Sequence, residues 1–174
     1  MILPDGRDQI VGLAFPSDFL GNVFVPQNDN SAVAVTDAEL CCFQRPQFDQ
    51  ALQDNPNLER ALRDKTLTDL HQAHKWMVVL GQMDATERVA SLLMQFSKRL
   101  AKPPTSQRAS AANLSTFVLP LDRGEIAAYL GLTVETVARK LTWMRKRRVN
   151  EIRNYYEIRV CDPDALEQLT GTVP

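Results

Sequence analysis

Residues 121–139 constrain the fold more strongly than any other part of this 174-residue chain. Asp122 can cap free backbone amides, and Glu125 can complete a capping box three residues later, so the spacing predicts the start of a helix. Gly131 predicts its end, because glycine readily adopts the left-handed conformation that follows many helices. Thr133 can cap a second helix directly afterwards. Two short helices joined by a glycine-containing turn predict a helix-turn-helix.

Apolar residues recur at helical spacing in both predicted helices. Ile126, Tyr129 and Leu130 form the apolar stripe of the first helix. Val137 and Leu141 lie four residues apart in the second. These faces are expected to be buried in the domain. The start of the second helix is then exposed, and an exposed helix start of this kind can enter the major groove of DNA.

Polar residues at this helix start have the chemistry of a DNA reader. Arg139 can donate two hydrogen bonds to guanine, and Glu135 can accept one from cytosine. Other residues can hold backbone phosphates, which set the docking register and much of the salt-dependent affinity. These residues are Arg123, Thr133, Thr136 and Lys140. Two ordinary charged surface helices are the alternative, but the caps, the turn, the apolar spacing and a basic helix end coincide here and favour DNA binding.

Residues 122–139 resemble the winged helix-turn-helix of the CRP/FNR family of bacterial transcription regulators. Residues 129–137, which read YLGLTVETV, are similar to the FNR and FixK branch of that family. The resemblance implies that Glu135, Ala138 and Arg139 contact bases, and that a dimer binds an inverted repeat with half-sites similar to TTGAT. Ala138 departs from the branch, which usually has serine there. A methyl group can pack on a thymine methyl but forms no hydrogen bond, so the preference at that base pair stays open.

A wing is expected after the second helix. Residues 154–160 have the composition and alternation of a strand, and Asp162 followed by Pro163 predicts a short terminal helix as far as Leu169. The family usually has a glycine soon after the recognition helix, and here Asn150 is the candidate for the left-handed turn residue. Three residues of the wing can approach the DNA backbone: Arg153, Tyr155 and Arg159.

The DNA-binding domain is predicted to span residues 84–174. Its first helix is expected to begin at a second capping box, formed by Asp84 and Glu87, and to continue with apolar residues at helical spacing. Residues 102–116 are rich in Pro, Ser, Ala and Asn and predict a loop, which leads into a short strand near Phe117.

A long helix is expected over residues 55–82. Mostly apolar residues recur there at spacings of four or three, which is typical of a coiled-coil seam. The seam consists of Leu62, Thr66, Leu70, Ala73, Met77 and Leu80. The resemblance implies that this helix pairs with its two-fold mate in a homodimer, and Gly81 is expected to be the hinge before the DNA-binding domain. A palindromic site also favours a dimer, because two recognition helices must lie one turn of DNA apart.

Residues 1–54 are expected to be rich in β-strands. The strands are predicted at residues 10–15, 19–25, 32–35 and 39–43. This region resembles part of the β-roll of the same family, a cupin-like, cyclic-nucleotide-binding-like sensor domain. The expected fold class is α+β, with a partial β-roll sensor, a long dimerisation helix and a C-terminal winged helix-turn-helix. Matched to the family, the chain begins within the roll, so either its start is assigned too far downstream or the regulator is truncated.

Cys41 matches the internal cysteine that binds a [4Fe-4S] cluster in oxygen-sensing members of the family. Such a cluster needs four thiolates or close substitutes, and the chain has three cysteines, Cys41, Cys42 and Cys161. No cofactor is therefore expected for this chain, and a cluster is expected only in a longer parent chain. Cyclic AMP is not expected, because no arginine stands near Asn30 to pair with the cyclic phosphate.

No pattern typical of an enzyme is recognisable. Cys41 with His71 or His74 can supply a nucleophile and a base, but nothing brings them together and no phosphate loop or oxyanion site is evident. The two histidines have the spacing of a metal pair on one helix face, yet no third ligand completes it. The alternative to direct DNA binding is a truncated chain that dimerises with full-length relatives and modulates them without binding DNA.

Composition agrees with a DNA-binding protein of the cytoplasm. The formal net charge is -1, so the basic character is local, and residues 139–148 contain six basic residues and no acidic ones. No signal peptide or membrane-spanning stretch is recognisable and the cysteine content fits a reducing compartment, so no membrane partner is expected. Promoter DNA and RNA polymerase are the expected partners, and oxygen or redox state is the expected signal. Activation and repression both stay open.

Overall fold

The chain folds into two units. One combines residues 1–18 with residues 79–174, and the other consists of residues 19–78. The computed structural model describes residues 9–21, 30–100, 116–153 and 156–171.

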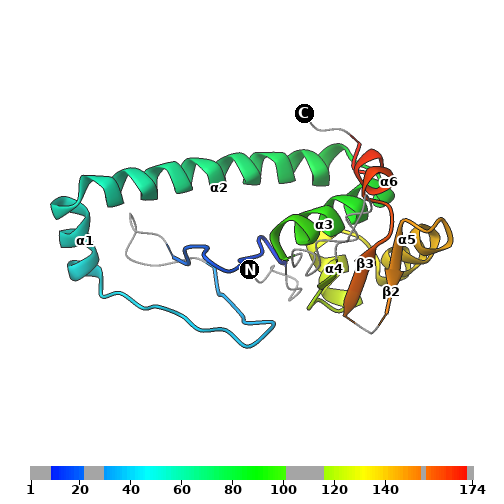
Figure 1. The fold of residues 1–174 in the computed structure, drawn as a ribbon, viewed down its shortest axis with the longest axis horizontal. Coiled ribbons are helices and arrows are strands. Elements are labelled where there is room, and N and C mark those ends of the chain that lie inside the picture. The colour runs from blue at the N-terminus through cyan, green and yellow to red at the C-terminus, as the bar shows by residue number, and fades with distance from the viewer. Residues whose placement is uncertain (1–8, 22–29, 101–115, 154–155, 172–174) are drawn as a thin grey trace, which may run out of the picture. The chain divides into compact units, whose positions relative to one another are not determined.

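Figure 1 shows the helices and strands of the described residues in chain order. The helices are α1 (Arg45–Asp54), α2 (Pro56–Gln82), α3 (Ala85–Leu100), α4 (Arg123–Leu130), α5 (Val134–Lys146) and α6 (Pro163–Gln168). The strands are β1 (Thr116–Val118), β2 (Asn150–Ile152) and β3 (Glu157–Val160).

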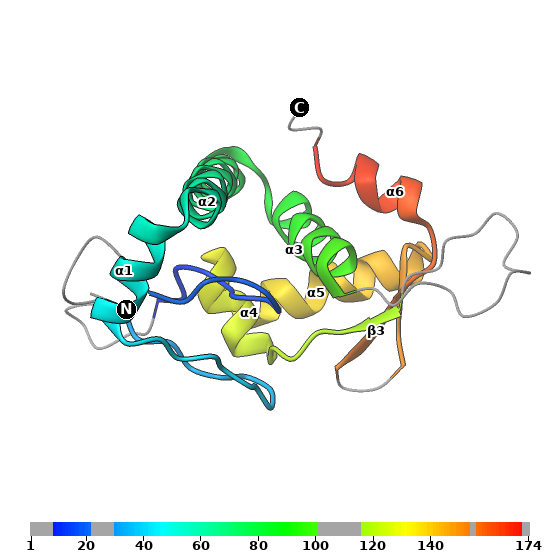
Figure 2. The same cartoon turned by 60° about the vertical axis from the view of Figure 1, so that its left-hand side comes forward.

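Helix α3 is the centre of the larger unit. Helices α5 and α6 and strand β1 all pack against it (Figure 2). Val89, Leu92 and Leu93 are almost completely buried, and the ring of Phe96 lies 6.2 Å from the ring of Phe117 in β1. The apolar spacing of residues 85–100 therefore predicted the buried face of this helix correctly.

The predicted capping box at the start of α3 is confirmed. The backbone amide of Glu87 donates to Asp84 Oδ1 over 3.0 Å, and the amide of Asp84 donates to Glu87 Oε2 over 2.7 Å. The hydrogen bond from the Glu87 amide, together with hydrogen bonds from Thr86, holds the pKa of the Asp84 carboxyl below its ordinary value. Asp84 thus fixes the first turn of the helix on which the unit is built.

The small sheet has the strand order β1-β3-β2, and both pairings are antiparallel. Phe117 of β1 and Ile152 of β2 both lie opposite Ile158 of the central strand, and Ile158 is buried. The expected strand near Phe117 is confirmed, and so is the wing strand over residues 157–160. Residues 154 and 155 lie outside the described part.

The left-handed residue after α5 is Arg148, with φ 60°, and not Asn150 as expected. Val149 is buried and its amide donates to the Met144 carbonyl over 3.1 Å, so the chain must reverse before Val149. Asn150 is then already the first residue of β2, where it lies opposite Val160. The terminal helix is as predicted, because Asp162 accepts a hydrogen bond from the Ala165 amide over 2.9 Å and so caps α6.

The β-strands expected near the N-terminus are not formed in the described residues, so the predictions for residues 10–15, 32–35 and 39–43 are wrong. A strand needs a neighbour for its backbone groups, and residues 9–18 contact helices instead. Gln9 Nε2 donates to the Ala128 carbonyl over 2.9 Å, and the ring of Phe15 lies 5.2 Å from that of Phe96. Of the strand expected over residues 19–25, only residues 19–21 are described, and they are not in a strand.

Helices α1 and α2 follow one another almost directly. α1 was not anticipated, and it ends at Asn55, whose Oδ1 accepts hydrogen bonds from the amides of Asn57 and Leu58 and so supports the start of α2. The long helix expected over residues 55–82 is confirmed, with 27 residues and a length of about 40 Å at 1.5 Å per residue. It runs through Gly81 without a break, and the turn falls after Gln82. No helix in the described residues is both long and apolar enough to cross a membrane.

Candidate nucleic-acid interface

The first helix of the helix-turn-helix, α4, is held at both ends by the predicted groups. Glu125 N donates to Asp122 Oδ1 and Asp122 N donates to Glu125 Oε2, each over 2.7 Å, which completes the capping box. At the other end Gly131 adopts φ 62°, and the amide of Leu132 donates to the Ala127 carbonyl over 3.0 Å. A left-handed residue at this position turns the chain toward α5.

The second helix, α5, begins at its predicted cap. The amide of Thr136 donates to Thr133 Oγ1 over 3.2 Å. Val137, Leu141 and Met144 are buried, and they form the face with which α5 packs on α3 and α4. The opposite face is exposed, as a recognition helix requires.

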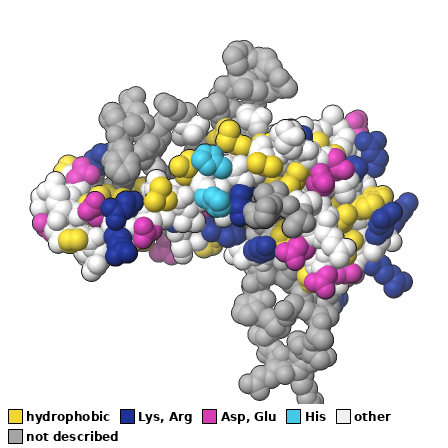
Figure 3. Space-filling model, turned by 90° about the horizontal axis from the view of Figure 1, so that it is seen from above, with side chains coloured by type: hydrophobic (Ala, Val, Ile, Leu, Met, Phe, Trp, Pro, Cys, Tyr) yellow, Lys and Arg dark blue, Asp and Glu magenta, His cyan; other side chains and the backbone are white. Residues whose placement is uncertain are grey.

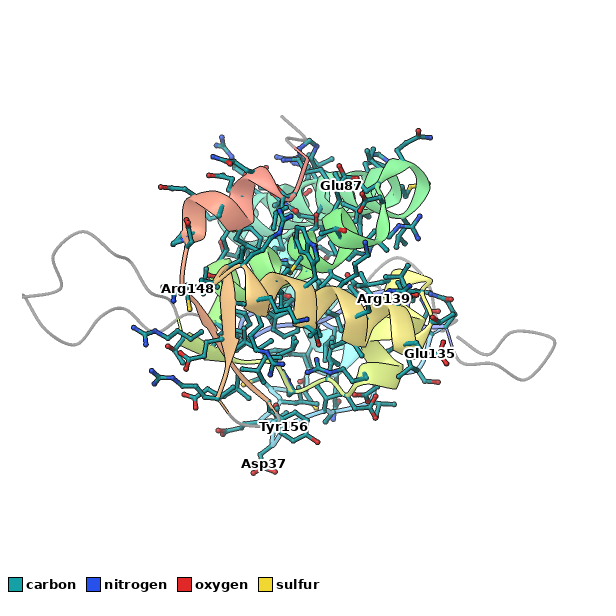
Figure 4. All side chains as sticks on the ribbon, turned by 90° about the vertical axis from the view of Figure 1, so that its right-hand side faces the viewer. Asp37, Glu87, Glu135, Arg139, Arg148 and Tyr156 are labelled. Atoms are coloured by element: carbon teal, nitrogen blue, oxygen red, sulfur yellow. The ribbon has the colours of Figure 1, made fainter. Side chains whose placement is uncertain are left out.

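All three predicted base readers are exposed and lie on the first two turns of α5. They are Glu135, Ala138 and Arg139. Figure 4 shows Glu135 and Arg139 together at the start of the helix, with Arg148 at its far end. The structure therefore brings together a carboxylate, a methyl group and a guanidinium, which can read cytosine, thymine and guanine respectively.

Thr136 is central to a short chain of hydroxyl contacts at this helix start. Thr133 Oγ1 lies 2.9 Å from Thr136 Oγ1, and Arg139 Nη2 donates to Thr136 Oγ1 over 3.3 Å. The cap and the guanidinium of Arg139 are thereby linked, which restricts the orientations of the Arg139 side chain.

The two predicted phosphate-binding cations differ in their surroundings. Lys140 Nζ donates to Thr86 Oγ1 of α3 over 2.8 Å, so part of its hydrogen-bonding capacity serves to join α5 to α3. Arg123 is half-buried, and desolvation holds the pKa of its guanidinium below the ordinary value. No hydrogen bond or ion pair of the Arg123 side chain is found among the described residues.

The C-terminal end of α5 is strongly basic. Four consecutive basic residues are exposed there, namely Arg145, Lys146, Arg147 and Arg148. In Figure 3 Lys and Arg side chains gather at the right-hand end of the molecule, where Figure 1 places α5. The guanidinium of Arg147 stacks 4.1 Å above the ring of Trp143. Cations at a helix C-terminus also interact favourably with the helix dipole.

One residue that positions the site was missed in the sequence. Arg88 of α3 donates from Nη1 to the Leu130 carbonyl over 3.1 Å and from Nε to the Met83 carbonyl over 2.9 Å. It therefore satisfies a free carbonyl at the end of α4 and holds that helix against α3. No local pattern marks it, because its partner is 42 residues away.

The wing residues are partly paired with one another. Glu151 Oε2 lies 3.6 Å from Arg153 Nε and 3.8 Å from Arg159 Nη1. Arg153 is exposed, whereas Arg159 is half-buried, so Arg153 is the more accessible of the two. Tyr155 lies outside the described residues. The neighbouring Tyr156 is exposed at the tip of the wing (Figure 4).

The seam of α2 is largely uncovered in the single chain. Leu70 is 51% exposed and Met77 is 68% exposed, while Leu62 and Leu80 are half-buried. His71 and His74 are exposed on the same helix. An exposed apolar seam of this kind is available to a partner helix.

The residues of this chain do not fit a [4Fe-4S] cluster. Cys41 and Cys42 are exposed and Cys161 is half-buried, and three thiols fall short of the four ligands that such a cluster takes. Within the described residues no three His, Cys, Asp or Glu side chains are grouped as metal ligands.

Residues 87–169 match the model of a protein family described as a Crp-like helix-turn-helix domain. The chain is 45% identical to a probable transcriptional activator of Rhizobium leguminosarum, over 97% of this chain and 67% of that protein. It is 38% identical to the transcriptional activator protein FnrL of Cereibacter sphaeroides, over 92% of this chain and 63% of that protein. It is 36% identical to the nitrogen fixation regulation protein FixK of Bradyrhizobium diazoefficiens, over 98% of this chain and 68% of that protein. The chain thus spans about two thirds of the length of these curated relatives.

Solved structures show the same fold. FixK2 from Bradyrhizobium japonicum superposes with a TM-score of 0.64 at 28% identity, over 75% of this chain and 60% of that chain. A CooA mutant from Carboxydothermus hydrogenoformans superposes with a TM-score of 0.58 at 24% identity, over 72% of this chain and 54% of that chain. The expected α+β class is confirmed.

Proposed function

The chain belongs to the CRP/FNR family of transcription regulators, and we propose that it binds an inverted-repeat promoter site as a homodimer and regulates transcription from it. The observation that carries the proposal is the exposed start of α5, where Glu135, Ala138 and Arg139 are presented on a helix capped by Thr133. A helix fixed in this way loses little conformational freedom when it enters a major groove.

Dimerisation through α2 supplies the second recognition helix that an inverted repeat requires. The half-exposed Leu70 and the more exposed Met77 lie on one seam, and pairing the seams of two chains would remove both from water. Two copies related by a two-fold axis present two recognition helices to two half-sites. Half-sites similar to TTGAT are those that the family resemblance implies.

The names of the relatives support a proposal for the compartment, the protein partner and the signal of this chain. They include proteins named transcriptional activators and one named an anaerobic regulatory protein, from Haemophilus influenzae. We accordingly place this chain in the cytoplasm, with RNA polymerase as the partner on promoter DNA and oxygen or redox state as the signal. No catalytic role is proposed.

The test is binding of the purified chain to a TTGAT inverted repeat and to a scrambled duplex, at two salt concentrations, with and without oxygen. Preference for the repeat supports the proposal. Equal binding to both duplexes overturns sequence-specific recognition. Failure to bind either one, with an intact dimer, favours the second candidate function, a dimerisation partner that modulates relatives without binding DNA.

A further inference from the structure

Arg145 lies on the same face of α5 as Ala138, a predicted base contact, and follows it by seven residues. Ala138, Thr142 and Arg145 share one face of the helix, because residues spaced by three or four lie above one another. All three line one open surface hollow of about 550 Å³. The same hollow is therefore lined by a predicted base contact, Ala138, and by an exposed arginine, Arg145.

Two further arginines line this hollow from other elements. Arg123 reaches it from the start of α4, and Arg153 reaches it from the end of β2. The floor is apolar, with Leu141 and Ile152. Three arginines, from α4, from α5 and from the residue after β2, thus line one hollow that also includes Ala138, a predicted base contact.

The positive charges around the hollow are only partly neutralised by neighbouring carboxylates. The side chains of Arg123 and Arg145 have no hydrogen bond or ion pair among the described residues. Glu151 pairs with Arg153, with Oε2 3.6 Å from Arg153 Nε, and Arg159 shares the same carboxylate oxygen at 3.8 Å. The carboxylate of Asp122, the neighbour of Arg123 in the sequence, accepts a hydrogen bond from the Glu125 amide and so caps α4. The desolvation that lowers the pKa of Arg123 also means that an anion there would meet a partly dehydrated cation.

We propose that Arg145 binds a DNA backbone phosphate and that Arg123, Arg145 and Arg153 together form an arginine clamp on one strand, next to the bases read by α5. This clamp rests on the proposed DNA-binding function. It adds Arg145 to the residues that contact DNA and names a backbone phosphate as the group that Arg145 binds. Guanidinium groups suit this role because their planar donor sets match phosphate oxygens. A clamp of this kind positions the protein on the duplex without reading its sequence.

The experiment compares Arg145→Ala with Arg147→Ala in the full chain. Arg147 is a matched control, because it is an exposed arginine at the same helix end but stacks on Trp143 and does not line the hollow. Affinity for the inverted repeat and for a scrambled duplex is measured across a salt series, and thermal unfolding checks that each variant is folded. Arg145→Lys tests whether charge alone restores the contact.

Loss of one phosphate contact should reduce the steepness of the plot of log affinity against log salt concentration by about one unit. It should also weaken binding to both duplexes by a similar factor, up to about tenfold near 0.1 M salt. Arg147→Ala should leave the slope unchanged, and Arg145→Lys should restore it in part. An unchanged slope in Arg145→Ala overturns the clamp, and so does an equal loss in both alanine variants. If the unmodified chain itself shows no preference for the repeat, the proposed function fails, which is a separate outcome.

Discussion

The guanidinium of Arg88 donates a hydrogen bond to the carbonyl of Leu130 over 3.1 Å, and this contact fastens the C-terminal end of α4 to α3. The same side chain donates to the Met83 carbonyl, so it also ties the end of α2 to the start of α3. The orientation of the helix-turn-helix thus depends on a residue of α3, outside the two helices α4 and α5.

Replacing Arg88 with alanine should lower the free energy of unfolding by about 1–2 kcal/mol, because two backbone carbonyls lose a charged donor. Chemical denaturation of the purified chain measures the change. Lys98→Ala, at an exposed position on the same helix, is the control and should change stability by less than about 0.5 kcal/mol. Equal effects of the two substitutions would contradict the role assigned to Arg88.

Asp84 should make stability depend on pH at the acid end. Its pKa is lowered in the folded chain, chiefly by the hydrogen bond from the Glu87 amide, so the carboxylate stabilises the fold above the ordinary pKa of aspartate. That contribution is lost as the pH falls through the lowered value. Asp84→Ala should cost about 1 kcal/mol at pH 7, which is typical of a lost helix cap.

Asp84→Asn separates the cap from the charge. Asparagine also caps helices well, so this variant should keep most of the stability at pH 7. As the pH falls from about 5 to about 2, however, the free energy of unfolding of this variant should decrease less than that of the unmodified chain. Denaturation curves across this pH range provide the measurement, and an unchanged acid profile in Asp84→Asn would refute the assignment.

The seam of α2 can be tested with two leucines on the same helix. Leu70 is on the seam and 51% exposed, whereas Leu67 is off the seam and 59% exposed. Leu70→Glu should weaken the dimer at least about tenfold, because it brings two like charges together and removes an apolar contact. Leu67→Glu should leave it intact. Sedimentation equilibrium distinguishes them, and equal dissociation by both would argue against this seam.

Local signals in the sequence predicted much of the candidate interface. The caps at Asp84, Asp122, Thr133 and Asp162 are all confirmed, because each depends on a side chain and a backbone amide within three residues. The left-handed Gly131 is confirmed for the same reason. Helices α2 to α6 could therefore be placed from spacing and caps alone.

Contacts between distant residues could not be predicted in this way. Lys140 was expected to meet phosphate, and its contact with Thr86 depends on how α5 packs on α3, 54 residues away in sequence. The gathering of Arg145 and Arg153 at one hollow has the same origin. Arg145 appeared in the sequence only as part of a basic helix end.

The N-terminal strands were predicted from apolar alternation, and this signal was insufficient. Residues such as Val33 and Phe43 suit a strand, but they are 83% and 69% exposed, and no strand forms in the described residues there. Strand propensity expresses how well a side chain fits a pleated, half-covered surface, so it needs a partner strand to take effect. The turn after α5 was misplaced because burial of Val149 outweighed the preference of asparagine for left-handed backbone.

The central claim is that Arg139 reads a base from the exposed start of α5. The most direct measurement is the affinity of the unmodified chain and of Arg139→Ala for a TTGAT inverted repeat and for a scrambled duplex at one salt concentration. The substitution should cost roughly 1–3 kcal/mol of binding free energy on the repeat and much less on the scrambled duplex, because a bidentate contact to guanine is lost. An equal loss on both duplexes, or no loss on the repeat, would contradict the claim.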